Sequence, residues 1–337
     1  MQLKHIAATL IASLPFVAIA QTNITIYGVA DIAVAVEDTD APGAGRRVAL
    51  NSGNQSSSRL GFRGTEDLGG GMKALFNLEA GVSLDTGAAD TALFGRRAVV
   101  GLEGGFGTLT LGREYTPIAG VAGPSDIFGQ GFFGSNLSAF TSNRLTRRLS
   151  NSVNYKTPSF GGVKGSLVYG LGEQATGPSR DTLGLAVNYA NGPLFLGAGY
   201  HVIERLAAGD DKEYAIGAGY KFGLVDVKAN YLVGDQTGAN NKFEQFNIGA
   251  SVGLGQGRLY ANIQQNKIQS GAKGNGFALA YSYALSKRTN LYTSYAMLRN
   301  NASGTFGLNS SSTNVTPAAT ALGADPSVFA IGMRHTF

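Results

Sequence analysis

The sequence of 337 residues contains no cysteine and only three histidines, and beyond its first 20 residues it has no long apolar run. Without disulfides, the chain must draw its stability from an extensive fold. Cysteine cannot ligate a metal here, and no His-x-x-x-His spacing occurs. A Ser-His-Asp site would have to use His201, for which the sequence offers no recognisable partners. These absences argue against an enzyme, a bound cofactor and a transmembrane helix.

Charge is also scarce. Lysine and arginine together number 27 against 22 acidic residues, which gives a formal net charge of +5. This excess is too small and too dispersed to indicate a nucleic-acid partner. Glycine, by contrast, occurs 49 times, with 14 tyrosines and 18 phenylalanines. Abundant glycine and aromatic residues, with few amphipathic helical runs, indicate an all-β protein.

The first 20 residues, MQLKHIAATLIASLPFVAIA, have the pattern of a secretory signal peptide. Lys4 supplies the basic start, residues 6–17 form the apolar run, and Ala18-Ile19-Ala20 is a small-residue cleavage site. The alternative is a retained membrane anchor, but the apolar run is shorter than the ~20 residues that a span requires. We therefore expect export, cleavage after Ala20, and a mature chain of residues 21–337 that forms one domain.

Strands with one apolar and one polar face are the main pattern of the chain. In residues 58–79, Leu60 and Phe62 alternate with Arg59 and Arg63. Such period-two alternation predicts a strand, but it leaves open which face lies outside. In a soluble β-sandwich the apolar face would be buried. In an outer-membrane barrel it would face lipid, and the arginines would face a water-filled lumen.

Two kinds of break separate the expected strands, and they alternate along the chain. Seven short turns and eight longer, polar loops connect 16 strands, which is typical of a bacterial outer-membrane barrel with its turns in the periplasm. The short turns are residues 66–71, 104–107, 159–162, 191–193, 222–223, 255–257 and 286–288. The longer loops are residues 38–57, 85–91, 116–147, 173–182, 205–212, 236–242, 268–275 and 300–326.

The last residues favour a barrel over a soluble β-sandwich or repeat protein. Phe329, Ile331 and Met333 share one face of a strand that continues to Phe337. A closed barrel needs its last strand to pair with its first, because this pairing removes both free edges. The expected partner is NITIYGVADIAVAVE, whose lipid face would carry Ile24, Ile26, Ile32, Val34 and Val36. We therefore predict a 16-stranded antiparallel transmembrane β-barrel with arginines inside.

Several blocks of sequence resemble the 16-stranded trimeric porins of Gram-negative outer membranes, in the group typical of β-proteobacteria. They are SRLGFRGTEDLGGGMKALFNLE, FGRRAVVGLEGGFGTLTLGREYTP, NSVNYKTPSFGGVKGSLVYG, YALSKRTNLYTSYAMLRN and the terminal IGMRHTF. The resemblance implies a homotrimer in which each subunit is its own channel, narrowed by a third loop folded into the pore. The longest internal break, residues 116–147, is the candidate for this loop 3.

Candidate residues of the pore constriction follow from alternation and from the resemblance. Arg59 and Arg148 lie on the polar face of their strands, and the resemblance implies that arginines at these motif positions line the wall opposite loop 3. A third arginine comes from the FGRR motif. Matching to the family favours Arg96, whereas parity with the apolar Val100 favours Arg97, and both stay open.

Acidic residues near the expected constriction are fewer than arginines. Asp126 lies within loop 3, while Glu79 and Glu114 are candidate counter-charges, and Arg144 and Arg147 lie near the loop's exit. Basic residues at the narrowest part of a pore favour anions, so an anion preference is predicted. The alternative is that the arginines only pair with these acids and stiffen the loop.

The aromatic residues Phe128, Phe132 and Phe133 of loop 3 either pack the loop against the wall or offer an apolar strip to a guest; packing is the favoured reading. The predicted function is passive diffusion of small hydrophilic solutes and inorganic ions across the outer membrane, in contact with its lipid and lipopolysaccharide. Two alternatives are a channel selective for anionic solutes such as organic acids or phosphate, and a barrel that serves mainly as a receptor or adhesin. The Ser-, Thr- and Asn-rich loop 300–326 would suit surface variation.

Overall fold

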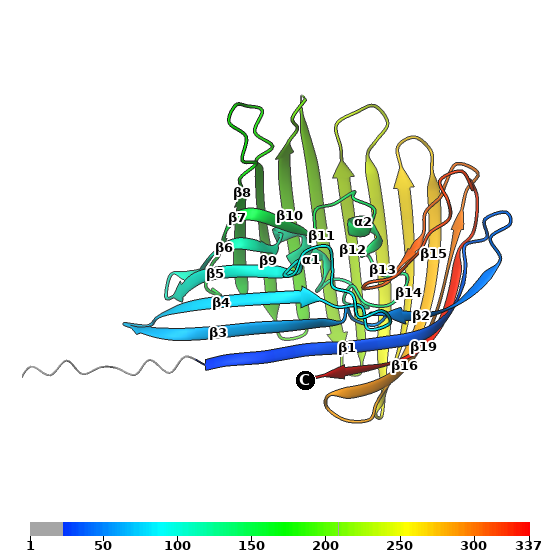
Figure 1. Cartoon of the computed structure of the whole chain (residues 1–337), viewed down its shortest axis with the longest axis horizontal. Coiled ribbons are helices and arrows are strands. Elements are labelled where there is room, and N and C mark those ends of the chain that lie inside the picture. Colours follow the sequence, from blue (N-terminus) through cyan, green and yellow to red (C-terminus); the bar gives the residue numbers. More distant parts are fainter. Residues whose placement is uncertain (1–22, 208) are drawn as a thin grey trace, which may run out of the picture.

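The computed structural model of the chain describes residues 23–207 and 209–337. The predicted signal peptide, with its cleavage site after Ala20, lies outside the described residues. Seventeen of the nineteen strands in the described chain belong to one antiparallel sheet that closes on itself (Figure 1). Period-two alternation thus produces the all-β fold that the sequence predicts.

The barrel wall consists of consecutive antiparallel neighbours. Its strands are β1 Asn23–Asp38, β2 Arg46–Ser52, β3 Arg59–Gly69, β4 Met72–Gly81, β5 Arg97–Gly104, β6 Gly107–Tyr115, β7 Arg148–Lys156, β8 Val163–Gly170, β9 Thr182–Asn191, β10 Leu194–Glu204, β11 Asp210–Phe222, β12 Val225–Asp235, β13 Phe243–Leu254, β14 Gly257–Ile268, β15 Lys273–Ala284, β16 Thr289–Asn300 and β19 Ser327–Thr336. β2 and β3 pair with the two halves of β1, so they count as one interrupted strand of the barrel. The barrel therefore has the predicted 16 strands.

Closure joins the first strand to the last. β19 pairs antiparallel with β1 from Val29 opposite Thr336 to Asp38 opposite Ser327. This confirms the prediction that the terminal strand removes both sheet edges by pairing with the first. Apolar side chains of both strands, such as Ile26 and Ile331, point outward and are exposed. The outer face is therefore the apolar one, as a lipid-facing wall requires.

The predicted turns and loops match the structure at most positions, with two corrections. Residues 46–52 are not loop: they form β2, in which Val48 and Leu50 are exposed on the outer face and extend the apolar pattern of β1. The predicted loop 85–91 is also too short, because β4 ends at Gly81 and β5 begins only at Arg97. Loop 116–147 has the predicted bounds, since β6 ends at Tyr115 and β7 begins at Arg148.

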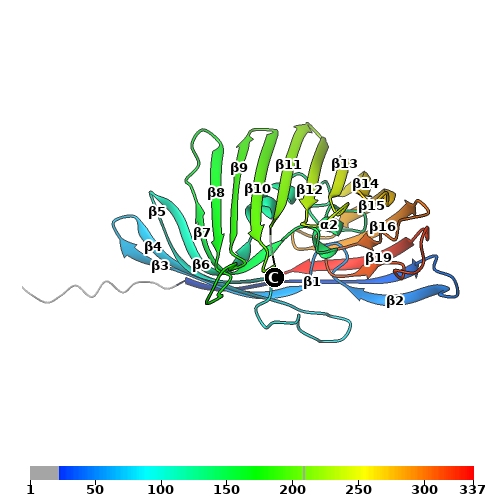
Figure 2. The same ribbon diagram turned by 90° about the horizontal axis from the view of Figure 1, so that it is seen from above.

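Within residues 23–207 and 209–337, helix is confined to this loop. It holds α1 Pro117–Ala122 and α2 Ser138–Thr141, which both lie inside the curve of the sheet (Figures 1 and 2). Among the described residues, no helix is long and apolar enough to span a membrane. A small hairpin of β17 Leu308–Asn309 and β18 Asn314–Val315 belongs to the long segment between β16 and β19. Two loops therefore occupy the interior, and between them they shape the candidate site.

Candidate functional site

Loop 3, residues 116–147, sits against one half of the barrel wall. Its α1 contacts strands β8 to β11. The wall accommodates the loop because its inward residues are small: a Cβ added at Gly217 would lie 2.3 Å from Ser125 Oγ, and one at Gly249 would lie 2.3 Å from Ile127 Cγ2. Any larger residue would collide, so these glycines determine how closely the loop approaches the wall.

Amide side chains of the wall hold the loop in place. Asn230 on β12 donates to the carbonyl of Ser125 at 2.9 Å, and Asn262 on β14 donates to the carbonyl of Gly134 at 2.7 Å. These bonds satisfy backbone groups of an irregular segment that lies inside the barrel, where they would otherwise be unpaired. The loop is thus fixed by hydrogen bonds as well as by close packing.

The three phenylalanines of loop 3 pack against the wall. Phe128, Phe132 and Phe133 are buried. The ring centroids of Phe132 and Tyr292 are 5.4 Å apart in an edge-to-face arrangement, and Tyr260 lies 6.0 Å from both Phe128 and Phe132. The structure therefore confirms the interpretation favoured from the sequence, that these rings pack the loop against the wall. Because they are buried, they form no exposed apolar surface for a ligand.

Asp126 shapes the loop from within and does not face the arginines. Its carboxylate is fully buried and accepts hydrogen bonds of 3.1 Å from the backbone N–H groups of Phe128, Gln130 and Asn136. Burial raises the pKa of Asp126 to about 6, although the three N–H groups act in the opposite direction. The expected counter-charge across the lumen is therefore an internal clamp of loop 3.

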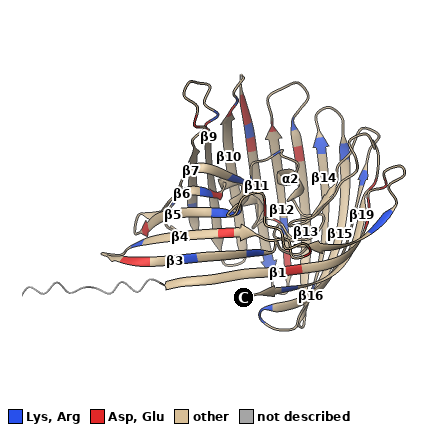
Figure 3. Ribbon diagram, in the orientation of Figure 1, with Lys and Arg blue, Asp and Glu red and all other residues tan. Residues whose placement is uncertain are grey.

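A cavity of about 430 Å³, which we call the neck, lies between loop 3 and the opposite half of the wall. Loop 3 contributes Ala119, Gly120, Gly129 and Gln130 to its lining. Its charged lining residues are Arg59, Arg96, Arg147 and Glu79. Figure 3 shows basic positions where β3, β5 and β7 approach loop 3. Three cations and one carboxylate therefore share this space.

Glu79 lies between two of the arginines. Its Oε1 is 2.7 Å from Arg96 Nε, and its Oε2 is 3.6 Å from Arg59 Nε. Arg59 also donates to the carbonyl of Ser57 at 3.0 Å. One carboxylate thus serves two guanidinium groups, and positive charge is left over.

Arg96 and Arg97 both reach the lumen, at different depths. Arg96 precedes β5, so strand alternation does not govern it, and its side chain lines the neck. Arg97 is the first residue of β5 and lies in a separate cavity with Arg63 toward the short turns. Its Nε donates to Glu114 at 3.0 Å. Family matching favours Arg96 and strand parity favours Arg97, and both side chains line cavities inside the barrel.

Tyr115, which the sequence analysis did not select, is the meeting point of the arginines. Arg96 and Arg148 donate to its hydroxyl oxygen at 3.0 and 2.8 Å. The guanidinium carbons of Arg147 and Arg148 lie 5.7 and 4.5 Å from its ring centroid, within cation–π range. The only signal for Tyr115 in the sequence is its place in GREYTP, directly before loop 3.

From the sequence, Arg147 is expected near the exit of loop 3 but not among the constriction residues. Within the described part of the chain it forms no ion pair, and its Nε is buried without a hydrogen-bond partner. Burial and the neighbouring Arg148 lower the pKa of Arg147 to about 9. It therefore stays charged at neutral pH and brings an unneutralised cation to the neck.

The segment 301–326, which we call loop 8, turns inward, contrary to the expectation of a surface loop. Leu308 and Val315 of its hairpin are buried, and Ser311 Oγ donates to the carbonyl of Gln130 in loop 3 at 2.8 Å. Ser311 also lines the neck. The apolar residues interspersed among its polar ones explain the difference, because they can be buried only inside the barrel.

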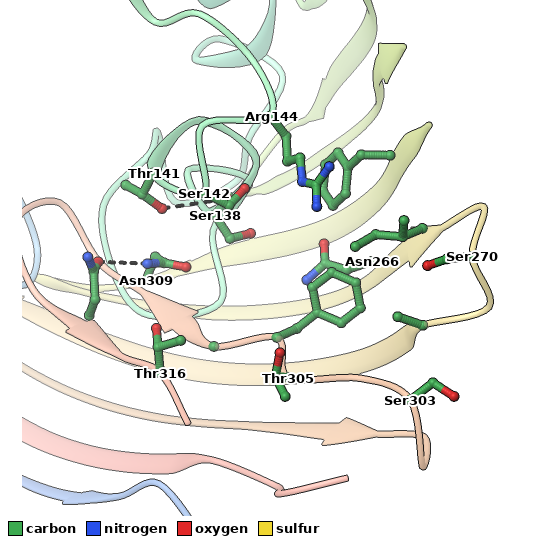
Figure 4. Close-up of a pocket in the computed structure, with 16 residues that line it drawn as sticks. Ser138, Thr141, Ser142, Arg144, Asn266, Ser270, Ser303, Thr305, Asn309 and Thr316 are labelled. Atoms are coloured by element: carbon green, nitrogen blue, oxygen red, sulfur yellow. Dashed lines mark hydrogen bonds between the residues drawn. The ribbon is translucent and has the colours of Figure 1, made fainter. Parts of the chain in front are cut away.

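Loops 3 and 8 enclose a second cavity of about 410 Å³, the recess (Figure 4). Most of its lining consists of hydroxyl and amide side chains, such as Ser138, Thr305 and Asn266, and its one charged residue is Arg144. Arg144 donates to Asn241 Oδ1 at 2.8 Å. The recess shares no lining residue with the neck, so the two are separate cavities.

Comparison with known proteins agrees with this architecture. A family model described as Gram-negative porin matches residues 7–303. Outer membrane porin protein 32 of Delftia acidovorans is 33% identical over 99% of this chain and 99% of its own, and a porin of Bordetella pertussis is 30% identical over 86% and 93%.

Solved structures give the same result. The anion-selective porin from Comamonas acidovorans is 31% identical, with a TM-score of 0.84 over 94% of this chain and 100% of its own. An outer membrane protein of Vibrio cholerae in its trimer form is 17% identical and shares the fold, with a TM-score of 0.70 over 94% of this chain and 99% of its own. By the family match, the relatives and the closed 16-stranded barrel, this chain belongs to the Gram-negative porins.

Proposed function

We propose that this porin forms a water-filled channel of the outer membrane, that small hydrophilic solutes and inorganic ions diffuse through it, and that anions are preferred. The observation that carries the preference is the composition of the neck. Arg59, Arg96 and Arg147 line it against a single carboxylate, that of Glu79, which leaves an excess of two positive charges. Arg148 adds a further cation through its contact with Tyr115.

The mechanism requires no covalent chemistry. Fixed positive charges in a narrow, partly desolvated passage raise the local concentration of anions and lower that of cations. Loop 3 limits solute size, because it fills the half of the lumen next to the glycine-bearing wall. Loop 8 narrows the entrance through its contact with loop 3, and it lines the lumen rather than the surface that a receptor would present.

The comparisons support the same sign of selectivity. A neighbour at 31% identity is described as an anion-selective porin. A homotrimer, in which each subunit is its own channel set in outer-membrane lipid and lipopolysaccharide, is part of the proposal, as is removal of residues 1–20 as a signal peptide. The trimer form of a protein with this fold supports the first of these.

The test is the reversal potential of the mature protein in a planar bilayer under a potassium chloride gradient. We expect an anion-signed potential that collapses toward zero in the R59S/R147S double variant, while R288S, in the turn between β15 and β16, retains most of it. A cation-signed wild-type potential, or one that the double variant leaves unchanged, would refute the proposal.

A channel selective for particular anionic solutes is the second candidate, since several arginines converge on one point, Tyr115. Saturation of flux with rising concentration of an organic acid or phosphate would favour it. Flux that stays proportional to concentration would favour general diffusion.

A further inference from the structure

We infer that Tyr115 determines which anions the neck accepts: it holds arginines in place without neutralising them and offers its own hydroxyl proton to an anion in the channel. This inference rests on the proposed function, because it concerns the same neck. Tyr115 lines the neck together with Arg59, Arg96 and Arg147. It is the last residue of β6, where the rigid wall passes into loop 3.

The arginines around Tyr115 carry like charges and must be held together. Arginines that converge on one point repel one another, and a carboxylate placed among them would cancel charge as it holds them. Glu114 does this for Arg97, whose Nε lies 3.0 Å from its carboxylate. Tyr115 instead accepts hydrogen bonds from Arg96 and Arg148 through a neutral oxygen, at 3.0 and 2.8 Å. The positive charge that attracts anions is therefore preserved.

The ring of Tyr115 strengthens this arrangement. The guanidinium carbon of Arg148 lies 4.5 Å from the ring centroid, and that of Arg147 lies 5.7 Å from it. An aromatic face attracts a cation without removing its charge. Neither Arg147 nor Arg148 forms an ion pair with any described residue, so this tyrosine is the principal contact that orients both.

The hydroxyl group of Tyr115 also has a proton to donate. A phenol has one proton to donate and lone pairs that accept. The two arginine N–H groups occupy the accepting side of the oxygen, and no acceptor for its proton occurs within residues 23–207 and 209–337. Because Tyr115 borders the neck, an anion there can accept this proton together with those of the guanidinium groups. Carboxylates and oxyanions, as stronger hydrogen-bond acceptors than halides, gain more from such a donor.

The test measures the permeability of formate relative to chloride, from reversal potentials with formate on one side of the bilayer and chloride on the other. In Y115F the ring stays and the hydroxyl is lost. We expect the formate-to-chloride ratio to fall about two- to tenfold, the range that corresponds to one hydrogen bond. In Y115L, which also loses the ring, the preference for chloride over potassium should fall as well, because the arginines lose their common anchor.

The matched control is Y231F. Tyr231 is exposed on the outer face, and its hydroxyl donates to Glu244 at 2.7 Å, so the same chemical change occurs away from the lumen. Y231F should keep the wild-type formate-to-chloride ratio. An unchanged ratio in folded Y115F overturns the inference. If Y115F does not fold, 4-aminophenylalanine at position 115 replaces it, because its amino group donates a hydrogen bond but accepts poorly. This variant should keep the wild-type formate-to-chloride ratio while the preference for chloride over potassium falls. A lower formate-to-chloride ratio in this variant overturns the inference.

Failure of the proposed function would be seen in a different measurement from failure of this inference. It would appear as a wild-type channel without anion preference in potassium chloride, whatever its formate-to-chloride ratio. Failure of the present inference leaves that preference intact and abolishes only the difference between wild type and Y115F.

Discussion

The two halves of the barrel wall around the neck carry opposite kinds of side chain. Where loop 3 rests on β11 and β13, the inward positions include Gly217 and Gly249, and a single added Cβ would collide with the loop. On the side where β3, β5 and β7 lie, the lining of the neck carries the long side chains of Arg59, Arg96 and Arg147. The size of the passage is therefore set by one half of the wall and its charge by the other. The two properties should respond to different mutations.

The largest expected effect comes from filling the small-residue half. In the G217A/G249A double variant, each new methyl group would lie 2.3 Å from an atom of loop 3, so the loop must move off the wall. Overpacking of this kind costs about 1–3 kcal/mol per site in the free energy of unfolding. We expect lower stability in denaturant titration. We also expect a lower single-channel conductance, because a loop displaced toward the opposite wall narrows the neck.

The control for this pair is G219A, whose added Cβ would lie 3.2 Å from the flexible side chain of Lys228 and 3.7 Å, an ordinary contact distance, from the carbonyl of Val227. It should keep the wild-type conductance. Wild-type conductance and stability in G217A/G249A would show that the seat of loop 3 does not set the size of the passage.

The next effect concerns the internal clamp of loop 3 and depends on pH. Burial raises the pKa of Asp126 to about 6 from an ordinary value of 3.8, so folding favours its protonated form. Its contribution to stability is then fully present below about pH 4 and is lost as pH rises through 6, by about 3 kcal/mol at 1.36 kcal/mol per pKa unit. D126N should remove this part of the pH dependence, measured as the unfolding free energy between pH 4 and 7.

The matched control is D181N, which alters a carboxylate outside loop 3. Hydrogen bonds from Tyr169 and Gly172 lower the pKa of Asp181, so D181N should keep the wild-type slope between pH 5 and 7. A D126N protein with the wild-type slope would mean that Asp126 does not titrate in this range.

A smaller effect is expected where loop 8 links to loop 3. S311A removes the donor to the carbonyl of Gln130, a bond of 2.8 Å, and should lower the unfolding free energy by about 1 kcal/mol. S303A, in the same loop but facing the recess, serves as the control. Equal stability of the two variants would show that the link contributes nothing.

The smallest expected effect concerns the charged half of the wall and compares a paired with an unpaired arginine. Arg147 has no carboxylate partner among the described residues, whereas Arg97 is paired with Glu114. Removing one unpaired charge about 5 Å from a permeating ion changes its energy by about 0.8 kcal/mol in water, or about fourfold in local anion concentration. R147Q should therefore lower the anion permeability about fourfold relative to the wild type, and R97Q clearly less. A larger loss in R97Q would reverse the assignment of the neck.

Much of the barrel could be predicted from the sequence, because its strands follow a local rule. Side chains of a strand alternate between two faces, so Ile26 and Ile331 could be assigned to the lipid face without knowledge of their neighbours. Glycine-rich turns and the pairing of the first strand with the last follow from equally local or topological constraints. The sign of the charge at the neck also follows from the sequence, since arginines outnumber acids around loop 3.

The tertiary structure alone decided what happens where alternation stops. Arg96 precedes β5 and contacts Glu79, and loop 8 folds into the lumen and contacts Gln130, in both cases through residues distant in the sequence. Asp126 accepts hydrogen bonds from the backbone of its own loop, which no strand periodicity describes. Tyr115 gathers arginines from both sides of a 32-residue loop, and no local pattern encodes such a meeting. The sequence by itself determined a strand-built barrel and predicted an anion preference, because periodicity and net charge are local or additive. The geometry of the neck depends on non-local packing, and only the folded chain could reveal it.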